Sequence, residues 1–320
     1  MKETLAVRGT VLRRQGAVRF IVALGIVSLF ADMTYEGARS VTGPFLGVLG
    51  ASAAAVGFVA GFGELLGYGL RLFSGHLTDR TGSYWVITIT GYTISLTAVP
   101  LLALAGRWEL AVLLIAAERA GKAIRNPARD AMLSYAGSHT GLGWAFGLHR
   151  MLDQTGAVLG PLLVGATVYW SGGYQTGFAI LAAPALCAMI VIFAATRSFP
   201  HPHDLKSVMP GLTPRHFPLR YWIYVGATSL IAAGYVDFPL VAYHFGRTQL
   251  IAPAAIPALY ALAMAADALA GFLLGRLFDR AGIGAMILAV CGSALASPLV
   301  LLGGLSAALA GTVLWGIGLG

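Results

Sequence analysis

The sequence predicts an all-α polytopic membrane protein, and three features indicate this class. Hydrophobic residues make up 58% of the 320 residues, charged residues make up only 11%, and the mean hydropathy is +0.78. Soluble domains contain about 25% charged residues. Apolar runs of about twenty residues, the length that a helix needs to cross a bilayer, recur along the chain. A soluble protein could bury one such helix, but it could not bury a dozen and still present a polar surface.

Nine apolar runs are long enough to span a membrane. They cover residues 18–40, 48–74, 84–105, 109–136, 143–170, 174–196, 220–245, 252–278 and 284–304. These runs are too long, and too rich in Leu, Ala, Ile and Gly, for the short alternating strands of an outer-membrane barrel, so we expect helices. Basic residues precede the first run and no small-residue cleavage site follows it, so we expect a retained anchor and not a removed signal peptide.

Lys and Arg gather on one side of the expected membrane. The side of the N-terminus carries Lys2, Arg8, Arg13, Arg14, Arg19, Arg71, Arg80, Arg197, Lys206, Arg215, Arg220, Arg276 and Arg280, and the other side carries Arg39, Arg107 and Arg247. The positive-inside rule therefore predicts a multi-pass protein of the cytoplasmic (inner) membrane with a cytoplasmic N-terminus. The net charge of +8 follows from this topology. It does not indicate nucleic-acid binding, because the basic residues form no face with stacking aromatics.

One charged octapeptide occurs twice, each time after a long apolar run. The copies are GHLTDRTG and GRLFDRAG, and their shared positions are Gly75, Asp79, Arg80, Gly82, Gly275, Asp279, Arg280 and Gly282. Gly suits a tight turn, and Asp can accept hydrogen bonds at a neighbouring helix N-terminus. The alternative is a charged turn that only enforces topology. The copies predict a six-helix half over 1–197, a cytoplasmic linker over 198–219, and a second half over 220–320, an organisation typical of secondary transporters.

The pattern G-x-L-x-D-R-x-G resembles the signature of the major facilitator superfamily, and its second copy lies where that family carries a weaker one. The family signature usually continues with basic residues, whereas this chain has Ser83-Tyr84 and Ile283-Gly284. The resemblance implies twelve helices in two halves with a site between them. It also implies that Asp79 engages the opposite half near helix eleven and that Asp279 does so near helix five, so that the octapeptides act in gating.

The run 143–170 contains GAVLGPLLVG, which resembles the G-x-x-x-G-P pattern of the family's antiporter branch through Gly156, Gly160 and Pro161. Small residues four apart let helices touch at the backbone, and Pro adds a bend, so the segment could act as a pivot. The alternative is plain close packing, since G-x-x-x-G is common in membrane helices. We expect an antiporter over a symporter.

The run 109–136 carries the densest set of charges. A charge at the bilayer centre is disfavoured by about 2.5–3.5 kcal/mol, so these groups should face partners or a water-filled cavity. Helical spacing places Glu118, Lys122, Arg125 and Arg129 on one stripe, and Arg119 and Asp130 on another. The segment E-R-x-G-K loosely resembles an antiporter pattern in which Arg119 is the functional basic residue. For Arg129 and Asp130 we expect pairing or a place at the headgroups.

Other ionisable residues lie inside the expected spans. They are Asp32, Glu36 and Arg39, which share one helical face, and Glu64, Arg150, Asp153, Asp237 and Asp267. A carboxylate in a poorly hydrated cavity can bind and release protons near neutral pH. We hypothesise that Asp32 and Glu36, and next Glu64, couple transport to protons, with Arg119 or Arg125 as the competing charge. The alternative for each residue is a static ion pair that holds helices together.

Further chemistry has little support in the sequence. His149 with Asp153, and the group His201, His203 and Asp204, are too loosely placed to define a metal site. The chain lacks a Walker phosphate loop and a G-x-S-x-G elbow, so we expect neither a cofactor nor an enzyme. We expect a proton-coupled exporter of a small molecule, working with protons in a lipid bilayer. The alternative is a non-transporting membrane sensor or scaffold, or an inactive truncated transporter.

The last run, SAALAGTVLWGIGLG, ends at Gly320 after fewer than the roughly twenty residues that a span needs. By the family plan, this leaves about ten of twelve helices. We expect either a fragment or a truncated product, and a monomer if the protein is full length.

Overall fold

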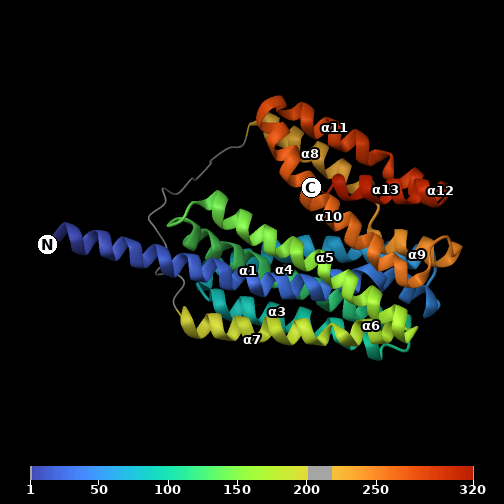
Figure 1. The fold of residues 1–320 in the computed structure, drawn as a ribbon, viewed down its shortest axis with the longest axis horizontal. Helices are drawn as coiled ribbons and strands as arrows, with labels where there is room; N and C mark the ends of the chain where they lie inside the picture. Colours follow the sequence, from blue (N-terminus) through green and yellow to red (C-terminus); the bar gives the residue numbers. More distant parts are fainter. Residues whose placement is uncertain (1, 201–217, 320) are drawn as a thin grey trace.

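The computed structural model describes residues 2–200 and 218–319, and the side chains at 2–14 and at several positions between 275 and 286 lie outside the description. Helices account for nearly all described residues, joined by short turns, with no strand among them (Figure 1). The all-α prediction is therefore confirmed. The linker predicted at 198–219, with His201, His203 and Asp204, lies mostly outside the described residues.

The N-terminal bundle packs around α1, a helix of 47 residues that contacts most of its neighbours. Its elements are α1 (Lys2–Val48), α2 (Ala53–Thr81), α3 (Tyr84–Leu101) with the short η1 (Leu102–Leu104), α4 (Trp108–Gly137), α5 (Leu142–Ser171), α6 (Tyr174–Ile180) and α7 (Ala182–Ser198). Buried aliphatic and aromatic side chains such as Phe20, Leu24 and Phe45 line α1 and fill the centre of the bundle.

The C-terminal bundle has a smaller core on α9, α10, α12 and α13, in which Trp315, Tyr260 and Phe238 are in mutual contact. Its elements are α8 (Leu219–Gly234), α9 (Phe238–Thr248), η3 (Pro253–Ala255), α10 (Ile256–Ala281), α11 (Ile283–Ala294), α12 (Ala296–Leu302) and α13 (Leu305–Ile317).

Seven helical segments of the described chain are long and apolar enough to cross a membrane, over 15–48, 53–81, 84–104, 142–171, 174–198, 219–248 and 253–274. The helix α4 is equally long, at 30 residues, but seven charged residues lower its hydropathy. The predicted runs correspond to these elements with shifted ends; for example, the run expected to begin at residue 48 begins at Ala53.

The run expected as one helix over 220–245 is interrupted. The helix α8 ends at Gly234, residues 235–237 are not helical, and α9 begins at Phe238. Two local causes act together. The Asp237 side chain accepts a hydrogen bond from the Phe238 backbone N–H at 2.9 Å, as helix N-caps do, and Pro239 has no N–H to continue a helical ladder. The Trp315 indole N–H donates to the Val236 carbonyl at 2.7 Å and satisfies part of the exposed backbone.

The two bundles meet at one end and diverge at the other. Far from the N-terminus, α9 packs against α1, where Gly43 touches the backbone of Pro239 and Gly246 lies against Pro44. Toward the N-terminal end, α8 and α11 lie away from the N-terminal bundle (Figure 1), and α8 has no buried residue. We call these ends the closed end and the open end.

Candidate functional site

A network of ion pairs joins the two bundles next to the closed end. Arg39 of α1 donates a hydrogen bond to Asp237, the residue that caps α9. The Arg119 guanidinium of α4 lies 2.7 Å from the Glu64 carboxylate of α2, and Arg39 lies 3.7 Å from the same carboxylate. Arg119 also lies 3.9 Å from Asp237 and 3.5 Å from Glu118. Two helices of one bundle, α1 and α4, thus hold a single carboxylate of the other, and Glu64 of α2 pairs with the same two arginines.

Local structure explains why these groups converge. Arg39 follows Glu36 and Asp32 on one face of α1 at helical spacing, and Arg119 lies on the face of α4 that packs on α2. The interruption of α8 and α9 places Asp237 at a helix start, where its side chain points out of the backbone toward α1. The side chains are mostly buried: 20% of Arg39, 11% of Arg119 and 15% of Asp237 are exposed.

This arrangement has a large electrostatic consequence. Removing one member of a buried ion pair leaves an uncompensated charge, which costs about 3–5 kcal/mol. Arg39 and Arg119 each also lie within 4.0 Å of a carboxylate of their own bundle, Glu64 or Glu118. Among the described residues, Asp237 is the one carboxylate of the C-terminal bundle that pairs with these arginines. The contact between the bundles therefore depends most strongly on Asp237.

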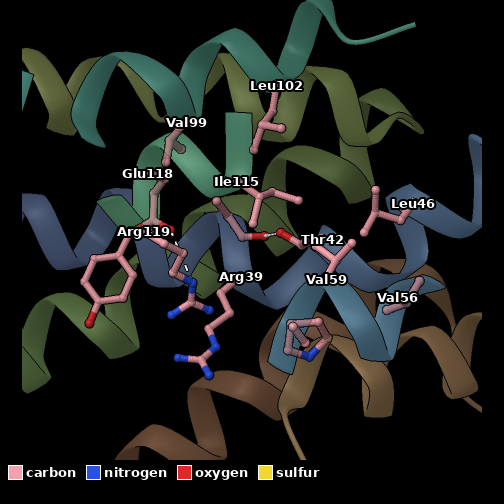
Figure 2. A pocket seen from close by; sticks show the side chains of 14 residues that line it. Arg39, Thr42, Leu46, Val56, Val59, Val99, Leu102, Ile115, Glu118 and Arg119 are labelled. Carbon is pink, nitrogen blue, oxygen red and sulfur yellow. Dashed lines mark hydrogen bonds and ion pairs between the residues drawn. The ribbon is translucent and has the colours of Figure 1, made fainter. Parts of the chain in front are cut away.

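A pocket adjoins the network, lined by residues of α1 to α4, by Leu102 of η1 and by Pro239 of α9 (Figure 2). Its cavity volume is about 30 Å³, which admits only a water molecule or two. Figure 2 shows the guanidinium groups of Arg39 and Arg119 at one end of the pocket, with Glu118 beside Arg119. Most of the remaining lining is apolar and comes from Ala38, Leu46, Val56, Val59, Ala60, Val99, Leu102 and Ile115, with Tyr35 and Thr42 beside them. The pocket therefore has one polar end and an otherwise mostly apolar lining.

Glu36 makes a second link between the bundles. Its carboxylate accepts a hydrogen bond from the Tyr260 hydroxyl of α10, and both side chains are almost fully buried. Asp32, one turn earlier on α1, lies close enough to Asp153 of α5 for the two carboxyl groups to interact electrostatically, and Lys122 acts on both. One oxygen of Asp153 is buried without a hydrogen-bond partner in the described structure. Adjacent carboxyl groups of this kind can take up and release a proton as a pair.

A third link lies between α5 and α10. The Asp267 carboxylate accepts hydrogen bonds from Arg150 at 3.2 Å and from Gln154 at 2.5 Å, and Arg150 also lies 3.7 Å from Asp153. Glu36 and Arg150 thus contact the C-terminal bundle directly, and Asp153 is connected to it through Arg150.

Several charged residues of α4 and α5 lie outside these links. Arg125 is 1% exposed and stacks over the Tyr92 ring of α3 at 4.1 Å, at a point where Gly91 and Gly121 bring α3 and α4 together. Arg129 pairs with its neighbour Asp130 at 2.8 Å, the internal pairing expected for these residues. The His149 ring shares a hydrogen bond with Ser28 at 2.8 Å.

The octapeptide glycines adopt the backbone that their positions predict. Gly82 and Gly282 have φ values of +63° and +56°, the left-handed region that favours glycine, and each ends its helix. Asp79 and Arg80 are exposed at the end of α2, and Arg280 is exposed at the end of α10. The side chain of Asp279, and the position Gly275, lie outside the described set. Gly75 faces Pro127 of α4.

The G-x-x-x-G-P segment packs inside the N-terminal bundle. A Cβ on Gly156 or Gly160 would collide with the α1 backbone at Leu29 and Met33, and Pro161 is buried. The close approach therefore joins α5 to α1. Ala157 of the same segment packs into the core of the other bundle, and a Cβ on Gly165 would lie 3.1 Å from the Ala254 carbonyl oxygen.

Two residues of these links, Tyr260 and Gln154, were not singled out from the sequence, and Asp237 and Asp267 were named only as ionisable residues inside the expected spans. The two aspartates were recognisable as carboxylates inside apolar runs, and Asp237 followed by Phe-Pro is also an N-cap signal. Tyr260 and Gln154 carry no such signal, because their roles depend on which helices pack together.

Comparisons with known proteins identify relatives of the whole arrangement. The profile of the Major Facilitator Superfamily matches residues 22–320. An uncharacterized protein of Mycobacterium tuberculosis is 39% identical over 311 residues, covering 95% of this chain and 76% of the relative. An uncharacterized MFS-type transporter of Methanocaldococcus jannaschii is 32% identical over 143 residues, covering 45% of this chain and 36% of its own.

Solved structures share the fold at low identity. The nucleoside transporter NupG superimposes with a TM-score of 0.74 at 15% identity, covering 94% of this chain and 79% of its own. A bacterial homolog of the human lysosomal transporter Spinster, inward-facing and unoccupied, superimposes with a TM-score of 0.64 at 17% identity, covering 95% and 72%.

Proposed function

The chain belongs to the major facilitator superfamily, a family of membrane transporters and not of enzymes, and we propose that it moves a small molecule by alternating access, driven by protons. Membership in the family gives the chain a transporter fold that crosses the membrane several times. We propose in addition the coupling to protons, the direction of transport and the residues responsible for both.

The observation that carries it is the ion-pair network between Arg39, Arg119, Glu64 and Asp237. It joins two bundles that meet at one end and diverge at the other (Figure 1). Alternating access requires such a contact to form in one state and break in another, with the substrate site between. The pocket beside the network, open to Arg39 and Arg119, supports a central substrate site.

Proton coupling is proposed through Glu36 and the pair Asp32 and Asp153. A charged Glu36 accepts a strong hydrogen bond from Tyr260, because hydrogen bonds to ionised acceptors are about twice as strong as neutral ones. Protonation of Glu36 weakens this link and favours separation of the bundles at the closed end. Glu64, held by Arg119 and Arg39, is the next coupling candidate, and Lys122 and Arg150 tune these carboxyl groups as nearby charges.

Export is proposed from topology and from the antiporter-like segment around Gly160. The basic residues place the open end on the cytoplasmic side, so a substrate enters from the cytoplasm and leaves when the closed end opens. The octapeptides are proposed to steady one state through Asp79 and Asp279, and Gly156, Gly160 and Pro161 to keep α5 rigid against α1. Transporters of similar structure differ in substrate, since nucleoside and peptide transporters are both among them, so the fold alone names no substrate.

The test is flux into proteoliposomes across an imposed pH gradient, with wild type, Glu36→Gln and the matched control Glu109→Gln. Glu109 is half exposed and pairs only with its exposed neighbour Arg107, so its variant should behave as wild type. In Glu36→Gln we expect exchange of substrate to persist while gradient-driven accumulation is lost.

Gradient-driven accumulation by Glu36→Gln at the wild-type level would refute the assignment of Glu36. A wild-type chain that carries no compound from a broad panel would favour a non-transporting membrane sensor or scaffold.

A further inference from the structure

A second pocket lies beside the ion-pair network and is lined mainly by residues of α2 and α4. Its polar lining is Arg39, Glu64, Tyr68, Arg71, Arg119 and Lys122, and its cavity volume is about 190 Å³. We call it the α2–α4 pocket. It shares Arg39 and Arg119 with the largely apolar pocket of Figure 2, so the two form adjoining compartments with these arginines between them.

The charges that line the α2–α4 pocket are unequal, with four cations and a single carboxylate, Glu64. Glu64 is already engaged by Arg119 at 2.7 Å and by Arg39 at 3.7 Å. The other carboxylates near these arginines, Asp237 and Glu118, do not line this pocket. Glu64 is therefore not available to neutralise the remaining two cations.

Those two cations are Arg71 of α2 and Lys122 of α4. Within the described part of the chain, no carboxylate lies within 4.0 Å of either group. Each cation instead lies over an aromatic ring, Arg71 over Tyr68 at 5.1 Å and Lys122 over Tyr35 at 3.5 Å. Four carboxyl groups act on Lys122 at longer range: Asp32 and Glu36 of α1, Glu118 of α4 and Asp153 of α5.

Arg71 has spare hydrogen-bonding capacity. Its Nη2 donates to the Asn126 side-chain oxygen at 3.1 Å when the amide is oriented to suit both groups, and its Nε is buried with no partner among the described residues. A guanidinium presents its donors in a planar fork that matches a carboxylate or a phosphate. Cations at membrane depth are costly without a counter-charge, and a ring face offsets only part of that cost.

We propose that the α2–α4 pocket binds the anionic group of the transported molecule, a carboxylate or a phosphate, between Arg71 and Lys122. The substrate class is an organic anion, and the mostly apolar lining beyond Arg39 and Arg119 faces the rest of the molecule. This inference rests on the proposed transport function and names its substrate class.

The first experiment measures binding and does not need transport. Thermal unfolding of the purified protein is followed with three anions, benzoate, hexanoate and phenyl phosphate, and with their uncharged counterparts benzamide, hexanamide and benzyl alcohol. A ligand that binds only the folded protein raises Tm in proportion to the logarithm of its concentration over its Kd. We expect at least one anion to raise Tm and its uncharged counterpart to leave it unchanged.

Variants locate the binding. Arg71→Gln and Lys122→Gln should each weaken the binding of that anion at least tenfold, and Arg71→Lys, which keeps the charge, should retain more affinity than Arg71→Gln. Arg107→Gln removes an arginine whose side chain is 80% exposed and should bind as wild type does.

Three outcomes would overturn the proposal: equal Tm shifts from an anion and its uncharged counterpart, no Tm shift from any anion, or wild-type affinity in both Gln variants. An equal shift from inorganic sulfate would do so too, because it would mean that the pocket holds an adventitious ion only.

Counterflow of the same compounds in proteoliposomes separates this inference from the proposed function. If the anions bind at Arg71 and Lys122 but no compound is exchanged, the transport proposal fails and the anion site stands. If uncharged compounds are exchanged and both Gln variants exchange them normally, transport stands and the anion site fails.

Discussion

The two bundles carry the same octapeptide but divide the membrane-embedded charges unequally. The N-terminal bundle buries or half-buries Asp32, Glu36, Arg39, Glu64, Glu118, Arg119, Lys122, Arg125 and Asp153. Among its described side chains, the C-terminal bundle offers the carboxylates Asp237 and Asp267 to these groups, supported by an aromatic core around Trp315. One bundle therefore holds a network with several alternative partners, and the other supplies single carboxylates at two points of contact.

This difference determines where a substitution acts. Loss of one charge in the N-terminal bundle leaves neighbours that can re-pair, as Arg119 can with Glu64 or Glu118. Loss of a carboxylate in the C-terminal bundle removes the whole interaction between the bundles at that point. The comparison predicts that conformational change is most sensitive to the carboxylates of the C-terminal bundle.

The largest expected effect comes from Asp237→Asn. This variant leaves Arg39 and Arg119 with Glu64 and Glu118 as their carboxylate partners. Loss of one partner of a buried ion pair costs about 3–5 kcal/mol. The closed end should therefore open, and coupled flux should fall more than tenfold. Opening is measured by labelling Tyr243→Cys, at the α1 contact, with a membrane-impermeant maleimide after Cys187 and Cys291 are replaced by Ser. Asp237→Glu keeps the charge and is the control; equal labelling of both variants would contradict the comparison.

An intermediate effect should distinguish contacts within a bundle from contacts between bundles. Gly160 touches the α1 backbone inside the N-terminal bundle, whereas Gly43 touches Pro239 across the interface. Overpacking costs about 1–3 kcal/mol, so Gly160→Ala should lower Tm. Gly43→Ala can relieve its clash by separation of the two bundles. This variant should therefore lower Tm less and should increase the labelling of Tyr243→Cys. The outcome that breaks the comparison is the reverse ranking of the two Tm losses.

The smallest expected effect is that of Tyr260→Phe, which removes one hydroxyl from Glu36 and leaves the aromatic contacts with Phe238 and Trp315 intact. A hydrogen bond contributes about 0.5–1.5 kcal/mol net, so Tm should fall only slightly and flux driven by a pH gradient should fall less than in Asp237→Asn. The measurement is gradient-driven flux beside Tm for both variants. A loss of flux as large as that of Asp237→Asn would contradict this ranking.

Much of the fold follows from the sequence for simple physical reasons. The apolar runs predicted the membrane helices, because a bilayer requires continuous apolar length and internal hydrogen bonding. Glycine was expected where the chain turns tightly, and Gly82 and Gly282 both lie at turns between helices with positive φ values. The break at 235–237 was not predicted, since the apolar pattern continues through it, although Asp237 and Pro239 carry the local signal.

The site was predictable only in part. Charged residues in apolar runs were recognisable one by one, because each is costly at membrane depth and must have a partner or water. Which partner each one meets depends on side-chain geometry across helices far apart in sequence. Arg125 was a candidate by helical spacing and Arg119 by the resemblance to the antiporter pattern, yet Arg125 is buried against Tyr92 and Arg119 faces the other bundle.

The sequence by itself determined that this chain is a multi-helix membrane protein with a repeated turn motif and a charged helix at 109–136, because hydropathy, turn chemistry and helical spacing are local properties. Only the tertiary structure decided that Arg39, Glu64, Arg119 and Asp237 form one network. It also decided that Arg71 and Lys122 face one pocket and that no carboxylate of the described residues lies within 4.0 Å of either cation. Electrostatic interaction depends on distance through space, and the distance between residues far apart along the chain is fixed only by how the helices pack.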